Sequence, residues 1–286
     1  MRTSAPSAGR VLLVVNFTLD ATFANRHVIA EMYAGRFDGL LFSISSTCVP
    51  DPAYANFVSR WVPPYGHPCS CGNPALGQHA AALHAPHPRL AELAWQANEY
   101  EFLVMTEDDC ILAPWLNAAA VRQRCAEVQA ALPEIYHCPR EHPAWSWAGH
   151  PAGCAAVDAV ADMLDFARLQ AHWRCYSGRE SPAEESRPVF SAFVDCLVFR
   201  TAFLRQVAGD FMQLAEVWHE IAIPTAMLHR TSRIGRTDGL ALWGEDRNRS
   251  LAALMATLGE HEFVHPIKLS RYDPREILDA YQRCAR

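Results

Sequence analysis

The sequence predicts an α/β fold with a single, mostly parallel central sheet flanked by helices. Residues 11–17 are a continuous apolar run, residues 40–45 are a second one, and a segment with helix signals separates them. Continuous apolar runs are typical of strands that are buried on both faces, as the strands of parallel sheets are. Half of the 286 residues are hydrophobic and a fifth are charged, which supports a sizeable core and excludes a disordered chain.

The first half of the chain is expected to alternate strands and helices. Asp20 can cap a helix that runs to about Ala34, where Gly35 supplies the stop signal. Residues 49–87 are rich in Pro, Gly, His and Cys, which predicts a long irregular connection. Pro88 then begins a helix.

A third buried strand is expected over residues 101–106, and it ends in the acidic triplet Glu107-Asp108-Asp109. The expected elements of the second half are a helix over 114–132, a loop over 133–153, a helix around 157–164, a polar loop over 174–189, a strand over 190–200, helices over 201–208 and 213–228, a short strand over 240–243, a helix over 248–258, a segment over 263–268 and a helix from about 274.

We find no linker that divides the chain, so residues 1–286 are expected to form one domain. Within it, residues from about 10 to 132 form one half and residues from about 133 to 270 the other. Residues 271–286 form a C-terminal helix.

Charge and hydropathy restrict the partners of the protein. The formal net charge is −6, which argues against binding to nucleic acid by bulk charge. No apolar stretch approaches the roughly 20 residues of a membrane span, and the run at residues 11–15 is shorter than the roughly 7–15 of a signal-peptide core. We therefore expect a cytoplasmic protein with reduced thiols, for which peripheral membrane association stays open.

The acidic triplet is the strongest chemical signal. Three consecutive acids at the carboxyl end of a buried strand repel one another, unless positive charge lies among them. A divalent cation such as Mg²⁺ or Mn²⁺ suits the position because it takes one or two carboxylates together with phosphate oxygens. The alternative is an acidic loop that only caps the next helix. Alternation along the chain places Glu107 and Asp109 on one side and Asp108 on the other, facing sugar or ribose.

The order of these elements and the triplet resemble the GT-A class of nucleotide-sugar glycosyltransferases. The resemblance covers roughly residues 10–270 and implies a Rossmann-like nucleotide-sugar-binding half, an acceptor-side half and a role in polysaccharide biosynthesis. It implies that Glu107 and Asp109, in place of a D-x-D motif, bind Mn²⁺ or Mg²⁺ and that His265 is a further metal or diphosphate ligand. Lys268 would neutralise phosphate charge. The alternative for His265 is an ordinary strand histidine.

The same resemblance assigns Asn16 and Thr18, at the end of the first strand, to the nucleotide-base edge of the site. Transfer with inversion needs a carboxylate that deprotonates the acceptor hydroxyl. Glu220 in an apolar segment is the first candidate, Asp246 in Trp-Gly-Glu-Asp is the second, and Asp195 on its strand is the third. A buried, salt-bridged glutamate is the structural alternative for Glu220.

Two other functions stay open at this level. A nucleotidyltransferase that makes an activated sugar also uses acidic metal ligands, but residues 11–26 lack the glycine-rich phosphate loop expected of it. A zinc-stabilised binding module would use Cys69 and Cys71, although the second cysteine pair of a usual zinc site is missing.

Overall fold

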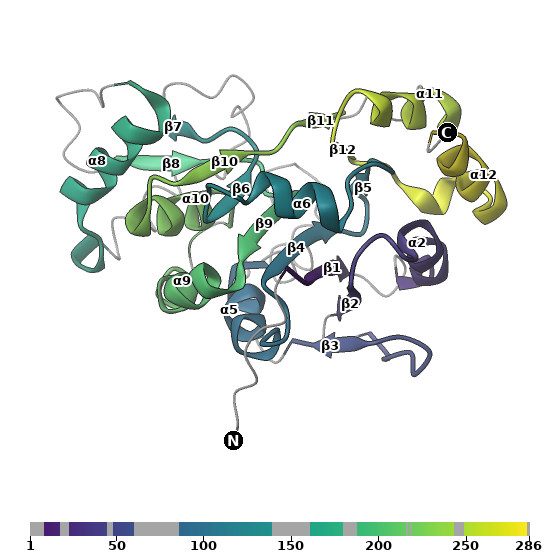
Figure 1. The fold of residues 1–286 in the computed structure, drawn as a ribbon, viewed down its shortest axis with the longest axis horizontal. Helices are drawn as coiled ribbons and strands as arrows, with labels where there is room; N and C mark the ends of the chain where they lie inside the picture. The colour runs from purple at the N-terminus through teal and green to yellow at the C-terminus, as the bar shows by residue number, and fades with distance from the viewer. Residues whose placement is uncertain are drawn as a thin grey trace, which may run out of the picture.

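The computed structural model describes residues 9–17, 23–44, 48–59, 86–138, 161–179, 188–215, 217, 219–242 and 249–284 (Figure 1). The strands are β1 (Val11–Phe17), β2 (Gly39–Ile44), β3 (Asn56–Val58), β4 (Phe102–Glu107), β5 (Ile111–Leu112), β6 (Ala130–Leu132), β7 (Tyr136–Cys138), β8 (Val189–Ser191), β9 (Cys196–Arg200), β10 (Ile234–Arg236), β11 (Gly239–Ala241) and β12 (Phe263–His265). The helices are α2 (Arg26–Tyr33), α5 (Pro86–Gln96), α6 (Ala118–Arg124), α8 (Phe166–Ser177), α9 (Thr201–Gln213), α10 (His219–Arg230), α11 (Leu251–Ala256) and α12 (Pro274–Cys284), with short 3₁₀ turns at Ala161–Met163, Thr257–Gly259 and Leu269–Arg271.

Seven strands form the central sheet in the order β10-β6-β9-β4-β1-β2-β3. β9 runs antiparallel to both of its neighbours, β4 and β6, whereas the other neighbouring pairs are parallel. The expected α/β fold with a mostly parallel central sheet is therefore confirmed. Because β1 and β4 are parallel neighbours, their carboxyl ends lie at the same edge of the sheet.

The core consists of two apolar clusters, one on each face of the sheet. Alternate residues of β1 point to opposite faces: Leu12 and Val14 belong to one cluster, whereas Leu13 and Val15 belong to the other. Helices α5, α8, α9 and α10 contribute to the first cluster, and α2, α6, α11 and α12 contribute to the second. Both faces of β1 are thus covered, which explains its continuous apolar sequence.

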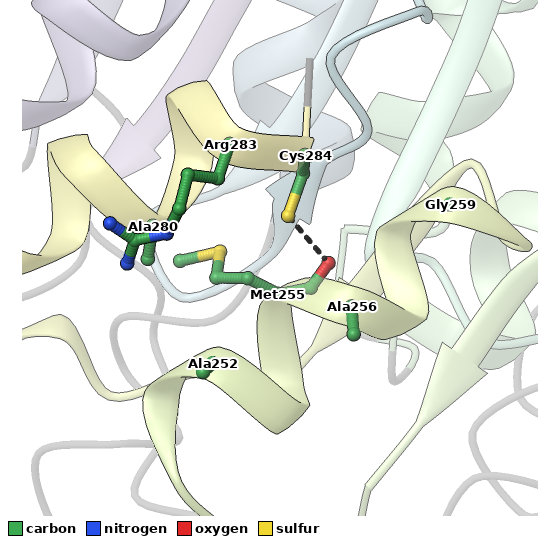
Figure 2. Close-up of a pocket in the computed structure, with 7 residues that line it drawn as sticks. All are labelled: Ala252, Met255, Ala256, Gly259, Ala280, Arg283 and Cys284. Carbon is green, nitrogen blue, oxygen red and sulfur yellow. Dashed lines mark hydrogen bonds between the residues drawn. The ribbon is translucent and has the colours of Figure 1, made fainter. Parts of the chain in front are cut away.

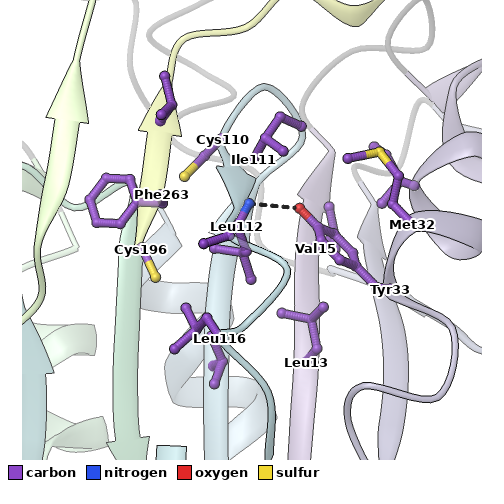
Figure 3. Packing of buried hydrophobic residues seen from close by; sticks show 14 of the residues in the cluster. Leu13, Val15, Met32, Tyr33, Cys110, Ile111, Leu112, Leu116, Cys196 and Phe263 are labelled. Carbon is purple, nitrogen blue, oxygen red and sulfur yellow. Dashed lines mark hydrogen bonds between the residues drawn. The ribbon is translucent and has the colours of Figure 1, made fainter. Parts of the chain in front are cut away.

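The second cluster also holds the segment that follows the acidic triplet (Figure 3). In this cluster the backbone N–H of Leu112 donates a hydrogen bond to the hydroxyl of Tyr33, at 3.1 Å. The hydroxyl of Tyr281 donates in turn to the Leu112 carbonyl, at 2.7 Å. Helices α2 and α12 therefore fix β5, the strand that begins two residues after Asp109.

A three-stranded sheet in the order β11-β12-β5 brings the late part of the chain to the acidic triplet. β12 pairs antiparallel with β5, with Val264 opposite Ile111. The N–H of Ile267 donates to the carbonyl of Asp109, at 2.7 Å. The residues that follow β12 are therefore held directly beside the acids.

The helix expected over residues 114–132 is wrong in its second part. Asn117 caps α6 by accepting hydrogen bonds from the N–H groups of Ala119 and Ala120, and the helix ends at Arg124. Residues 130–132 form β6, which pairs with β9 on one side and β10 on the other. Pairing with distant strands overrides the helix preference of the alanines here.

The strand expected over residues 190–200 is two strands. β8 pairs with β7 in a separate two-stranded ribbon, and β9 enters the central sheet. The four residues between them, 192–195, change the direction of the chain and place Asp195 immediately before β9.

Two short strands and several element ends also differ from expectation. β3 lies inside the connection expected to be irregular, and β7 lies inside the loop expected over 133–153. α8 extends to Ser177, whereas a loop was expected from residue 174, and the two helices expected over 201–208 and 213–228 are α9 and α10. The helix expected around 157–164 is seen only as the 3₁₀ turn at Ala161–Met163, because residues 157–160 lie outside the described ranges.

A pocket of about 340 Å³ lies between α11 and α12, where Met255, Ala280 and Arg283 line it together with Cys284 (Figure 2). The thiol of Cys284 donates to the carbonyl of Met255, at 3.1 Å. None of the predicted site residues lines this pocket, so it does not coincide with the predicted chemistry. Within the described ranges, no helix has both the length and the apolar character that a bilayer crossing requires.

A buried histidine in α5 makes the stability of the fold pH-dependent. His87 is fully buried, and its Nε2 lies 3.0 Å from the carbonyl of Leu214. Burial lowers the pKa of His87 to about 4, so the unfolded chain binds a proton at a higher pH than the folded chain does. This contribution to stability is present above pH 6.5 and is lost as the pH falls toward 4, by about 1.4 kcal/mol for each pH unit.

The expected result is that His87→Gln loses less stability than the wild type between pH 7 and pH 5 in denaturant titrations. The exposed His27→Gln variant is the control and should follow the wild type. Equal acid sensitivity of His87→Gln and wild type would contradict the assignment.

Candidate functional site

The acidic triplet lies at the carboxyl end of β4, directly beside the end of β1. Asn16 of β1 is in register with Glu107 of β4, and the Nδ2 of Asn16 donates to both carboxylate oxygens, at 2.9 and 3.1 Å. The N–H of Asp108 donates to the carbonyl of Asn16, at 3.1 Å. The end of the first strand and the triplet therefore form one polar cluster.

A buried arginine from α5 completes this side of the cluster. Arg89 is only 5% exposed, and its Nη1 donates to the Oδ1 of Asn16 and, at 3.4 Å, to the carbonyl of Phe17. Burial lowers the pKa of Arg89, whereas the negative charge of Glu107 opposes that effect. Asn16 thus links a guanidinium to the Glu107 carboxylate.

The environment of Glu107 disfavours its charged form. Burial of the carboxyl group is the main cause of a pKa raised to about 8, and the neighbouring charges of Asp108 and Asp109 act in the same direction. The Asn16 hydrogen bonds and Arg89 lower it without cancelling these effects. Glu107 is therefore a carboxylate that additional positive charge would stabilise.

Asp109 faces a different set of partners. Its Oδ1 lies 3.1 Å from the Nε2 of His265, and its Oδ2 pairs with the ammonium of Lys268. Burial alone would raise the pKa of Asp109, but the hydrogen bond and charge of His265, together with Lys268, hold it below its ordinary value. The predicted proximity of His265 and Lys268 to the triplet is observed.

The imidazole of His265 lies between two carboxylates. Its Nδ1 is 3.1 Å from the Oδ2 of Asp195, and both of these side chains are about 90% buried. Burial alone would lower the pKa of His265, but the charge of Asp195 and the contacts with Asp109 raise it well above its ordinary value. The two carboxylates therefore favour the protonated form of the ring.

Glu220 lies in the first turn of α10 and is 4% exposed. Its carbonyl accepts a hydrogen bond from the N–H of Ala192, at 2.9 Å, in the segment that leads to Asp195. The role of Glu220 as the base stays a prediction. Thr18 and Asp246, together with Cys69 and Cys71, lie outside the described residues.

The donor groups of this cluster suit a hard divalent cation. In the described part of the chain, no three His, Cys, Asp or Glu side chains converge as a ready metal cage. Mg²⁺ and Mn²⁺ at phosphate sites do not need such a cage, because one or two carboxylates suffice when substrate phosphates and water complete the shell. Three adjacent carboxylates at the end of β4 favour an added cation, and the raised pKa of Glu107 agrees with this. Glu107 and Asp109 would hold it, with His265 beside Asp109.

Arg89 was not anticipated from the sequence. It is four residues before Leu93, on the same stripe of α5 as the apolar residues, and a basic residue inside an apolar stripe is the only signal that could have revealed it. Asp195 was expected as a third candidate for the base. Its contact with His265 depends on the order of the strands, so no local sequence pattern predicts it.

The raised pKa of Glu107 leads to a stability prediction. The folded chain holds this proton more tightly than the unfolded chain does, so wild-type stability is lost as the pH rises from about 4.5 to about 8. Glu107→Gln removes the charge that the site disfavours, so we expect the variant to melt a few degrees above the wild type at pH 8 and close to it at pH 5.

Thermal melts at both pH values without added metal check this expectation. Glu99→Gln is the matched control, because Glu99 is 63% exposed and pairs with Arg10 at the surface. A Glu107→Gln variant that is less stable than the wild type at pH 8 would show that Glu107 is a structural carboxylate.

Three comparisons describe what the chain is similar to. No protein-family model matches the sequence, and no curated protein matches it. Solved structures do match. One is the bifunctional glycosyltransferase WbbM in its apo form, at 9% identity and a TM-score of 0.46, with 97% of this chain and 50% of that chain covered. The chain thus spans half the length of WbbM.

Two further solved structures match with similar identities and TM-scores. The galactosyltransferase LgtC, in complex with donor and acceptor sugar analogues, has 6% identity and a TM-score of 0.45, with 96% of this chain and 95% of that chain covered. Core-mannan synthase A (CmsA/Ktr4) from Aspergillus fumigatus, in its Mn/GDP form, has 8% identity and a TM-score of 0.42, with 80% and 73% covered.

Proposed function

We propose that this chain is a GT-A-type glycosyltransferase that moves a sugar from a nucleotide-sugar donor to a glycan or other hydroxyl acceptor. The observation that carries the proposal is the convergence of the acidic triplet with Asn16, His265 and Lys268 at the carboxyl edge of the sheet. Ligands of open α/β sheets bind at this edge. Charged side chains from four separate segments meet there, since Arg89 of α5 and Asp195 before β9 join the triplet and the residues at the end of β12. A loop that only caps a helix would not require this convergence.

Glu107 and Asp109 would hold Mn²⁺ or Mg²⁺ in this proposal. When bound, the cation neutralises the negative charge of the leaving nucleoside diphosphate. Lys268 supplies a positive charge on the same side, and its four-carbon stem lets it move from Asp109 to a phosphate oxygen. In this proposal Asp108 would face the sugar or the ribose, and Asn16 and Thr18 would contribute to binding of the base.

The acceptor hydroxyl needs a group that takes its proton as the new glycosidic bond forms. We assign this role to Glu220, with Asp246 as the second candidate, and we propose inversion at the sugar carbon. Asp195 is less suited to the role, because its carboxylate is already paired with His265.

Thermal-shift screening against UDP-, GDP-, CMP- and ADP-sugars, each with and without Mn²⁺, tests the proposal and identifies the donor. We expect stabilisation by one nucleotide class that depends on the metal. Zinc analysis of the purified protein addresses the alternative of a zinc-stabilised module. One tightly bound zinc per chain that Glu107→Ala leaves in place, with no response to any nucleotide sugar, would favour the module.

A further inference from the structure

Asp195 has no direct role in the proposed reaction, yet its backbone and its side chain both contact residues of the candidate site. It precedes β9, whose first residue, Cys196, is in register with Thr106 of β4. The carbonyl of Asp195 accepts from the Thr106 hydroxyl at 3.1 Å and from the N–H of Glu107 at 3.4 Å. The backbone of Asp195 is therefore fixed to the strand that carries the acidic triplet.

The side chain of Asp195 reaches a different element, β12. Its Oδ2 is 3.1 Å from the Nδ1 of His265, and the opposite nitrogen of the same ring is 3.1 Å from the Oδ1 of Asp109. The His265 backbone is held as well, since its carbonyl accepts from the N–H of Leu242 at 2.6 Å. The ion pair at Nδ1 and the held backbone leave Nε2 of the ring facing Asp109.

A carboxylate paired with one imidazole nitrogen leaves the other nitrogen to bind a metal. We propose that Asp195 is a positioning residue: it holds His265 so that Nε2 is directed to the cation site at Asp109. The metal part of this inference rests on the proposed function, whereas the orientation of the ring does not. Asp195 therefore acts through His265.

The test combines a binding measurement with a double-mutant cycle. Mn²⁺ affinity is measured by calorimetry for the wild type, Asp195→Ala, His265→Ala and the double variant, each checked for folding by its melting temperature. We expect Asp195→Ala to weaken Mn²⁺ binding about 10–100-fold, as the loss of a group that supports a metal ligand does. Asp195→Asn keeps a hydrogen-bond acceptor but not the charge, so its Mn²⁺ affinity should lie between those of the wild type and Asp195→Ala.

The double-mutant cycle distinguishes an effect of Asp195 through His265 from an effect that does not depend on His265. In the His265→Ala background, Asp195→Ala should have little further effect, because the ring it positions is gone. An equal loss in both backgrounds, or no loss in either, would overturn the inference.

A second readout needs no metal. The Nδ1 proton of His265 should give a slowly exchanging NMR signal in the wild type that disappears in Asp195→Ala, while the signal of His229, which faces Asp210 elsewhere, stays. If the wild type binds no divalent cation, the proposed function fails but this signal still tests the orientation. A His265 signal that persists in Asp195→Ala would overturn the positioning role.

Discussion

Calorimetric titration of Glu107→Ala or Asp109→Ala with UDP or GDP and Mn²⁺ is expected to show no metal-dependent binding. In the proposal Glu107 and Asp109 hold the cation together, so removing either acid takes away half of the carboxylate charge that the protein supplies to it. Loss of a residue that merely supports a ligand costs about 10–100-fold in metal affinity, and loss of a ligand should cost more. Nucleotide affinity measured with a chelator present should change little for Glu107→Ala.

Asp51→Ala is the matched control for this experiment. Asp51 also pairs with a basic side chain, since Arg26 Nε lies 2.6 Å from its carboxylate, but it follows no strand of the candidate site. Both triplet variants must melt cooperatively, which shows that they are folded, before their affinities are compared with the wild type. Unchanged metal-dependent affinity in either variant would refute the assignment of that acid.

Glu220→Gln is expected to reduce sugar transfer by about 10²–10⁴-fold while leaving donor binding intact. The reason is that the glutamine amide cannot take the proton from the hydroxyl group of the acceptor substrate. Glu220 is buried in the first turn of α10, and the isosteric change removes the charge without opening a cavity. Initial rates with saturating donor, alongside calorimetry of the same preparation, separate catalysis from binding.

Glu262→Gln is the control for Glu220→Gln, because Glu262 is also a buried glutamate, is paired with Arg124 and has no role in the proposed reaction. It should retain transfer. If Glu220→Gln retains transfer as well, Asp246→Asn is the next variant to test. Loss of activity there would move the role of the base to Asp246, and retention in both would favour a retaining enzyme.

Local sequence patterns were sufficient to predict β1 and β4, which are buried on both faces. The apolar run of β1 has the observed bounds, and β4 is displaced by one residue from the strand predicted before the triplet. These strands carry their own signal, because covering both faces requires apolar residues at every position. The same reasoning fails for β6, since a short alanine-rich run reads as helix until β9 and β10 are known to flank it.

The sequence by itself determined that acids lie at a sheet edge and that a histidine and a lysine three residues apart follow near the C-terminus. Only the tertiary structure decided which groups meet: Asn16 with Glu107 and Arg89, and Asp109 with His265 and Lys268. The parallel pairing of β1 with β4 sets the first of these groups, and the pairing of β12 with β5 sets the second. Contacts between residues so distant along the chain depend on strand order, which no local pattern encodes.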